Sequence, residues 1–140
     1  MRNRAYSEIH QASHAVARTA MTPLDRTQMD PVFTAVARYF ALMSDTTRLR
    51  ILHAVCNGER HVNEIVELTG GSQTNISRNL NLMHERGALE RRKEGTQVYY
   101  RVADQALVEL CRNVCQRVSA SVHRDDALRQ GLSQVADGFS

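Results

Sequence analysis

Tryptophan is absent from this 140-residue chain, and lysine, proline and aromatic residues are scarce. There is one lysine against 17 arginines, there are two prolines, and aromatic residues make up 5% of the chain. No apolar run approaches the roughly 18 residues that a transmembrane helix needs. Arg2 and Arg4 are not followed by the apolar segment of a secretory signal. We therefore expect a cytoplasmic protein with no membrane partner.

Cysteine is also rare, with three thiols at Cys56, Cys111 and Cys115. Structural disulfides are not expected in a cytosolic chain. Redox chemistry and metal ligation both stay open for these thiols.

The basic residues are unevenly distributed. Between Ser72 and Arg101 lie six basic and three acidic residues, a net charge of +3 that equals the net charge of the whole chain. A local basic patch is the electrostatic footprint of phosphate binding, although a charged solvated surface has the same composition. The arginine side chain favours bidentate contacts with phosphate or guanine.

The first half of the chain predicts two helices. Asp30 and Pro31 suit a helix start, as an N-cap followed by proline at the first helical position. Ser44 or Asp45 caps the next helix, which Gly58 ends. The second helix is expected to bury a stripe of Leu49, Leu52, Val55 and Cys56.

Residues 62 to 102 predict two further helices and a hairpin. A short helix stops at Gly70-Gly71, and Ser72 caps a longer one, which ends at Gly87. Residues 88–93 form a basic strand, Glu94-Gly95 a turn, and the following residues alternate as a returning strand. The longer helix turns three apolar residues inward: Ile76, Leu80 and Met83.

Asp104 caps a final long helix with Leu107, Cys111, Val114 and Val118 at the spacing of a helix–helix seam. The expected fold is mainly α with a small β-hairpin, a winged helix-turn-helix in the order α-α-α-α-β-β-α. We expect a weakly ordered arm over residues 1–29, the DNA-binding and dimerisation domain over 30–122, and a C-terminal tail over 123–140 with a frayed turn or two.

A helix with a polar outer face followed by a basic hairpin is typical of a DNA-binding domain. The helix fits the major groove, where its exposed first turns meet base edges, and its N-terminus favours a phosphate. The hairpin lies over the flanking backbone or minor groove. The expected contacts are Ser72, Gln73, Thr74, Ser77 and Arg78 from the helix, and Arg91, Arg92, Lys93 and Gln97 from the hairpin.

Residues 30–118 resemble the ArsR/SmtB family of bacterial winged-helix repressors. The resemblance rests on ALMSDTTRLRIL, on Gly58-Glu59, and on VNEIVELTG, SQTNISRNL, HERGALERRKEG and VYYRV. It implies a homodimer built from the first and last helices, bound to a palindromic operator in double-stranded DNA and released by an inducer. It also implies groove contacts by Gln73, Thr74, Ser77 and Arg78, and a wing contact by Arg92. The family usually has histidine where Asn79 stands.

The resemblance leaves the inducer open. The short helix HVNEIVELTG lacks the cysteine motif of many metal sensors, and Ala106 and Arg117 occupy two positions that are ligands in others. No zinc or nickel site, and no cofactor, is therefore expected. The family's sulfide and persulfide sensors have one cysteine in the second helix and one in the last. This chain has Cys56 in the second helix and Cys111 and Cys115 in the last, displaced by about one turn from the family's positions.

Sulfur or redox species are thus the favoured inducers. Three thiolates also suit arsenite or another soft metal ion. Cysteine is equally at home as a small buried apolar residue with no sensing role. A thiol enzyme lacks an evident group to activate the thiol, so no catalytic residue is assigned, and a winged-helix module that binds protein is a further alternative.

Overall fold

The computed structural model describes residues 22–122 and 124–139. The chain divides into two units, with the boundary between Arg38 and Tyr39. Most of the predicted arm over residues 1–29 lies outside the described residues. Within the described residues, no helix has the length and apolarity to cross a membrane.

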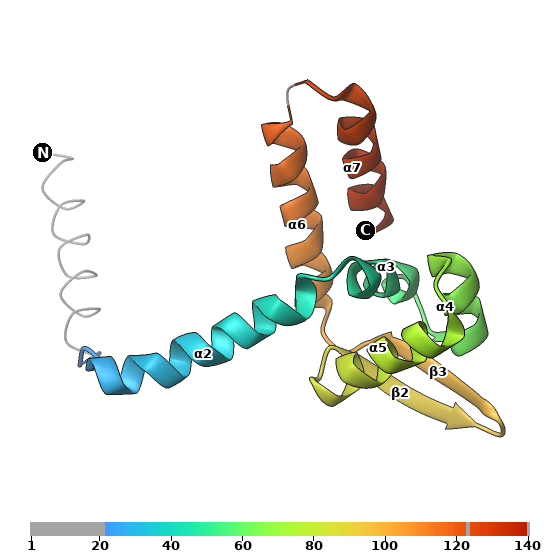
Figure 1. Ribbon diagram of the computed structural model, residues 1–140, viewed down its shortest axis with the longest axis horizontal. Helices are drawn as coiled ribbons and strands as arrows, with labels where there is room; N and C mark the ends of the chain where they lie inside the picture. Colours follow the sequence, from blue (N-terminus) through green and yellow to red (C-terminus); the bar gives the residue numbers. More distant parts are fainter. Residues whose placement is uncertain (1–21, 123, 140) are drawn as a thin grey trace, which may run out of the picture. The chain divides into compact units, whose positions relative to one another are not determined.

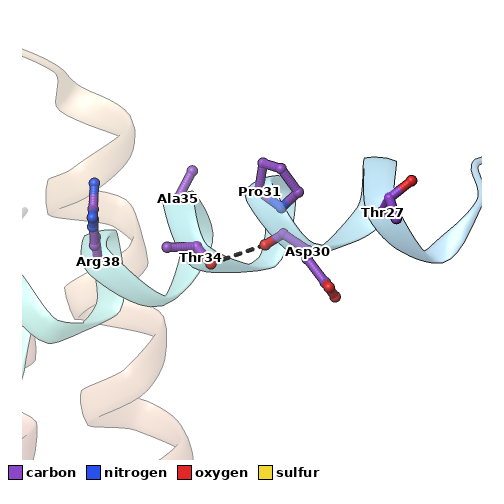
Figure 2. Close-up of a pocket in the computed structure, with 6 residues that line it drawn as sticks. All are labelled: Thr27, Asp30, Pro31, Thr34, Ala35 and Arg38. Carbon is purple, nitrogen blue, oxygen red and sulfur yellow. Dashed lines mark hydrogen bonds between the residues drawn. The ribbon is translucent and has the colours of Figure 1, made fainter.

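Helix α2 (Arg26–Met43) starts earlier than the sequence predicted. Asp25 and Gln28 form a reciprocal cap, in which the Gln28 N–H donates to Asp25 Oδ1 at 2.9 Å and the Asp25 N–H donates to Gln28 Oε1 at 3.1 Å. Pro31 is therefore inside the helix, and the predicted start at Asp30-Pro31 is wrong. Figure 2 shows this stretch, where the Thr34 hydroxyl donates to the Asp30 carbonyl at 2.9 Å. The helix exposes four large apolar side chains before residue 38: Met29, Val32, Phe33 and Val36.

Three helices follow in the second unit: α3 (Thr46–Val55), α4 (Val62–Thr69) and α5 (Gln73–Glu85). Asp45, rather than Ser44, caps α3 by accepting from the Arg48 N–H at 3.0 Å. Gly70 ends α4 in the left-handed region at φ +70°, a conformation that glycine adopts without strain. Helices α4 and α5 with this turn form the predicted helix-turn-helix.

The core of the second unit lies between these helices and the sheet. The three inward residues of α5, namely Ile76, Leu80 and Met83, are fully buried as predicted, and they pack with Ile51, Leu52 and Ile65. Complete burial of an aliphatic side chain of this size contributes about 1.5–3 kcal/mol. The prediction for Leu49 is wrong, because this side chain is 37% exposed, whereas the rest of the predicted stripe is buried.

The sheet has three strands rather than two, in the order β1-β3-β2. The two-residue strand β1 (Arg60–His61) pairs with β3 (Gln97–Val102), which pairs with β2 (Leu89–Glu94), all antiparallel. The wing hairpin closes with Glu94 opposite Gln97, so its two-residue loop is Gly95-Thr96. The turn lies one residue later than predicted, with Gly95 at φ +58°.

Helix α6 (Gln105–Ser121) begins after Asp104, whose carboxylate accepts from the Ala106 N–H at 2.9 Å. Helix α7 (Asp126–Gly138) then returns alongside α6 (Figure 1). The prediction of a tail over residues 123–140 therefore differs from the structure. Its described part forms a 13-residue helix, which is followed by the buried Phe139. The element order gains β1 and α7 relative to the prediction.

Candidate nucleic-acid interface and thiol cavity

The outer side of α5 carries polar and basic side chains over a buried apolar side. Gln73, Thr74, Arg78 and Asn81 are exposed and Ser77 is half-buried. Ser72 is the N-cap, and its hydroxyl accepts from the Asn75 N–H at 3.2 Å. The helix start thus has the geometry that the sequence predicted, and its remaining N–H groups favour an anion.

Asn79 lies on the same helix but belongs to the interior, where it is 9% exposed. Its side-chain amide donates to the Asn75 carbonyl at 2.9 Å, and its Oδ1 accepts from Arg48 Nη1 at 3.3 Å. Arg48 in turn donates to the Leu42 carbonyl at 2.6 Å and the Ala41 carbonyl at 3.2 Å. Asn79 therefore links the helix-turn-helix to the carbonyl end of α2 and is not available to bases. Residue type alone did not reveal this role.

The wing presents its basic residues on two opposite sides, because side chains alternate along a strand. Arg91 and Lys93 lie on the side of α5, where they line a hollow of about 550 Å³ together with Ser77 and Asn81. Arg91 Nη1 approaches Asn81 Oδ1 at 3.5 Å. We call the surface formed by the outer residues of α5 with Arg91 and Lys93 the α5–wing face.

Arg92 points to the other side of the hairpin and is already paired. Its guanidinium donates to Glu59 at 2.6 and 3.1 Å and to Glu94 at 2.6 Å, and it lies 4.6 Å from the centre of the Tyr99 ring. The hydrogen bonds from Arg92 lower the pKa of the Glu59 carboxyl. The structure therefore separates Arg92 from Arg91 and Lys93, which the sequence had grouped together.

Charge pairing reinforces this separation. Arg101 is also neutralised, by Glu90 across the hairpin at 2.6 Å. Arg78, Arg91 and Lys93 form no ion pair with any residue in the described part of the chain. The α5–wing face thus has three cations without a carboxylate partner, whereas the other side of the wing is neutralised, and Gln97 is exposed at the end of the wing.

Cys56 is buried at the end of α3 beneath the C-terminal end of α7. Its Sγ donates to the Gly138 carbonyl at 3.1 Å, and Asn57 Nδ2 donates to the same carbonyl at 2.8 Å. Arg112 Nη2 donates to the Phe139 carbonyl at 2.9 Å. This thiol has a packing and hydrogen-bonding role that fastens α7 to α3.

Cys111 and Cys115 lie apart from this contact, one turn from each other on α6. Both line a cavity of about 680 Å³ between the end of α2 and helices α3, α4, α6 and α7, and Cys56 is not among the lining residues. We call this space the thiol cavity. Cys111 is buried and Cys115 is half-buried. The structure thus brings together two of the three cysteines that the sequence singled out.

Burial raises the pKa of all three thiols. A thiol that stays protonated is a weak nucleophile, so the environment does not activate these residues as a catalytic cysteine would require. Within residues 22–122 and 124–139, no group of three histidine, cysteine or acidic side chains is placed to hold a metal ion. The geometry therefore gives no support to a site built from all three cysteines of one chain.

Comparison with known proteins defines the family. Residues 45–90, from the start of α3 to the first part of the wing, match the model of bacterial regulatory proteins of the arsR family. The homodimeric winged helix-turn-helix DNA-binding domain of Mb0332 from Mycobacterium bovis, described as a possible ArsR-family transcriptional regulator, is 31% identical. The match covers 75% of this chain and 94% of that domain, with a TM-score of 0.58. The chain belongs to the ArsR family.

Two curated relatives of this ArsR-family chain are transcriptional regulators by name. The HTH-type regulator Rv0324 of Mycobacterium tuberculosis is 39% identical over 54% of this chain and 33% of its own length. A probable mercury resistance operon repressor of Streptomyces lividans is 35% identical over 53% of this chain and 59% of its own length. The matched regions thus span about a third and somewhat over half of these relatives. The winged helix-turn-helix prediction is confirmed.

Proposed function

We propose that this ArsR-family chain is a transcriptional repressor that binds a palindromic operator in double-stranded DNA as a homodimer, in the cytoplasm. The observation that carries the proposal is the α5–wing face, where unpaired cations from the wing lie on the same side as the polar outer residues of α5. The relative from M. bovis is named as a homodimeric DNA-binding domain and that from S. lividans as a probable repressor, which supports the same function.

Each residue of the face has a role in this proposal. Gln73 and Thr74, in the exposed first turn of α5, contact base edges, and Arg78 contacts guanine or a phosphate one turn later. Arg91 and Lys93 bind the flanking phosphates. The first N–H groups of α5, after the Ser72 cap, favour a further phosphate, while Ser77 and Gln97 add polar contacts in the groove and at the wing end.

Arg92 has a different role in the proposal from the one that the family resemblance implied. Its two carboxylate partners compensate its charge, and a phosphate would have to displace one of them. We assign Arg92 to holding the wing against Glu59, so that Arg91 and Lys93 keep their orientation.

The homodimer is formed by helices α2 and α6, which correspond to the first and last helices expected from the sequence. Val32, Phe33 and Val36 of α2 are exposed, as is Val118 on the predicted seam of α6. Exposed apolar surface of this kind marks a protein interface. A twofold symmetric dimer presents two copies of α5 to two half-sites of a palindrome.

The test is a fluorescence anisotropy titration of duplex DNA from upstream of the chain's own gene at increasing salt. Three phosphate contacts per protomer give about six per dimer, so the logarithm of the affinity should fall with the logarithm of salt with a slope of about −5. If the chain were instead a winged-helix module that binds protein, the anisotropy of the DNA would not rise at any salt concentration. That result would sink the proposal.

For the inducer, we propose sulfur species that act on Cys111 and Cys115. Side chains at i and i+4 of a helix have Cβ atoms about 5–6 Å apart, which exceeds the roughly 3.5–4.5 Å of a disulfide. A bridge with additional sulfur atoms fits this spacing better than a direct S–S bond. It forms when the Cys115 thiolate attacks an inorganic polysulfide and displaces a shorter polysulfide anion. The Cys111 thiol then attacks the bound sulfur chain and gives up its proton, which leaves with the displaced terminal sulfur as hydrosulfide.

A soft metal ion or arsenite is the second candidate inducer. Two thiolates on adjacent turns suit a soft ion, and the S. lividans relative is named for mercury resistance. Cys56 enters neither proposal as a direct ligand, since its Sγ donates to Gly138 beneath α7.

Mass spectrometry of the repressor after treatment with polysulfide, hydrogen peroxide or arsenite, with DNA binding measured in parallel, separates these inducers. We expect polysulfide alone to add sulfur between Cys111 and Cys115 and to release DNA, and Cys115→Ser to abolish both effects. Cys56→Ser is the matched control and should retain the response. Release by all three reagents in Cys115→Ser would contradict thiol sensing at this residue.

A further inference from the structure

The exposed apolar side chains of the second unit are concentrated at the thiol cavity. Five of the eight large apolar side chains that are exposed between residues 39 and 139 line it, and they come from several different helices. These five are Phe40, Leu49, Leu68, Val114 and Val135. An exposed apolar side chain forgoes the favourable free energy of burial. A cluster of such side chains in one hollow therefore indicates a binding site.

The cavity has the dimensions and walls of a small-molecule site. Its volume of about 680 Å³ lies within the roughly 300–1,000 Å³ of ligand pockets, which occur preferentially between helices of bundles. The wall at the C-terminal end of α7 is held in place by packing and by hydrogen bonds. Phe139 is 2% exposed and packs edge-to-face on His53 at 5.0 Å, while Cys56 and Arg112 donate to the last carbonyls of the described chain.

The few polar groups of the lining favour an anion. Arg50 is exposed, lines the cavity and forms no ion pair with the rest of the described chain. Of the described residues that line the cavity, none is acidic. Ser44 adds a hydroxyl to the lining, whereas the walls from α6 and α7 are apolar apart from the two thiols.

We propose that the thiol cavity binds an amphiphilic organic anion, a carboxylate carried on an apolar chain or ring. The apolar body lies against Phe40, Leu49 and Val114, and the carboxylate pairs with Arg50. Burial raises the pKa of Cys111 and Cys115 in this lining, which favours the uncharged thiols and suits a noncovalent apolar contact. The binding requires neither DNA nor thiol chemistry, so it stands or falls separately from the proposed repressor function.

Calorimetric titration of the full chain with sodium octanoate and with 1-octanol, both below micelle formation, tests the proposal. We expect one octanoate per chain and weaker binding of the alcohol. Arg50→Gln should weaken octanoate by about fivefold, as for a partly exposed ion pair, and leave octanol unchanged. Arg117→Gln, on the exposed side of α6 and outside the lining, is the matched control and should change neither.

A second variant addresses the cavity volume directly. The larger side chain in Leu49→Trp fills the cavity from its exposed rim and should abolish binding of both ligands, whereas Leu128→Trp, on α7 outside the lining, should bind normally. Absence of octanoate binding to the unmodified protein would overturn the proposal. A second result would also overturn it: Leu49→Trp could dissociate the dimer and leave octanoate binding intact. The occupant of the cavity would then be a second copy of the chain.

Discussion

On the α5–wing face the exposed side chains are polar or basic and cover a core whose residues are fully buried. At the thiol cavity between α3, α6 and α7, five large apolar side chains are exposed, and the polar atoms His53 Nε2 and Arg112 Nε are buried. Neither atom has a hydrogen-bond partner among the described residues. Both regions pack against helix α3, and they differ in the polarity of the side chains that they expose to solvent.

The difference shows two ways in which a small domain prepares a binding surface. A polyanion such as DNA is attracted by unpaired cations, and its phosphates need no apolar burial, so the α5–wing face can stay fully solvated. Apolar surface at the other end is favourable only when something covers it. The first region should therefore respond to charge substitutions and salt, and the second to changes in volume and packing.

The largest expected effect is on the first region. Arg78→Ala removes a contact worth about 2 kcal/mol in each protomer, so a dimer should lose roughly 1000-fold in affinity. Anisotropy titration with operator DNA measures the loss, and size-exclusion chromatography checks that the dimer survives. Arg117→Ala, on α6, removes the same charge elsewhere and should cost little. Equal losses in the two variants would show that overall charge, rather than the α5–wing face, determines binding.

The second region should respond in stability instead. Phe139→Ala removes a buried ring that packs on His53, and large-to-small changes of this kind cost about 3–5 kcal/mol. Urea unfolding monitored by circular dichroism gives the change. The exposed Leu128 on the same helix is the control, and Leu128→Ala should cost less than about 0.5 kcal/mol. A Phe139→Ala variant as stable as this control would mean that α7 is not anchored through its C-terminal end.

These two regions also differ in how far the sequence predicted them. The helix-turn-helix was predictable because Ile76, Leu80 and Met83 recur at helical spacing, and because Gly70 and Ser72 mark the turn between its two helices. A two-residue strand such as β1 is too short to show periodicity, and it is defined by the pairing of Arg60 with Tyr100 and of His61 with Tyr99 across the sheet. Helix α7 was missed for a related reason: it buries only Ala136 of its own residues, and it is held by packing on α6, by the buried Phe139 and by hydrogen bonds to its last carbonyls.

The residue types of the candidate site were predictable from the sequence, but which of its side chains are paired or buried was not. Period-2 alternation places Arg92 opposite Arg91 and Lys93, yet only the position of Glu59, 33 residues earlier, shows which side is neutralised. Asn79 is similar, because its burial depends on Arg48 from another helix. Pairing between distant segments, rather than local composition, decided both outcomes.

A smaller effect should separate the two sides of the wing. Arg91→Ala leaves one phosphate per protomer without its cation, so the salt slope of DNA binding should become shallower by about 0.9 for each such phosphate. Arg92→Ala removes a cation that Glu59 and Glu94 already neutralise, so its salt slope should change much less. Salt titrations of both variants on one operator measure this. A larger slope change for Arg92→Ala would return the wing contact to Arg92 and contradict the assignment of the two sides.

The smallest effect concerns the thiols. Burial raises the pKa of Cys115 above its ordinary value of 9.0, so at pH 8 the reactive thiolate is scarcer than in a free thiol, and alkylation should be slower. The rate should still be rising above pH 9, where that of an ordinary thiol levels off. Because the folded state favours the protonated forms of all three thiols, the stability they contribute is complete at neutral pH and is lost as the pH rises from 9 through the raised values. Pulsed alkylation with N-ethylmaleimide from pH 7 to 10, read by peptide mass spectrometry, should modify the half-buried Cys115 before Cys111 and Cys56. Faster modification of Cys56 would show that α7 detaches readily from α3, and the apolar end would then be an open surface rather than a cavity.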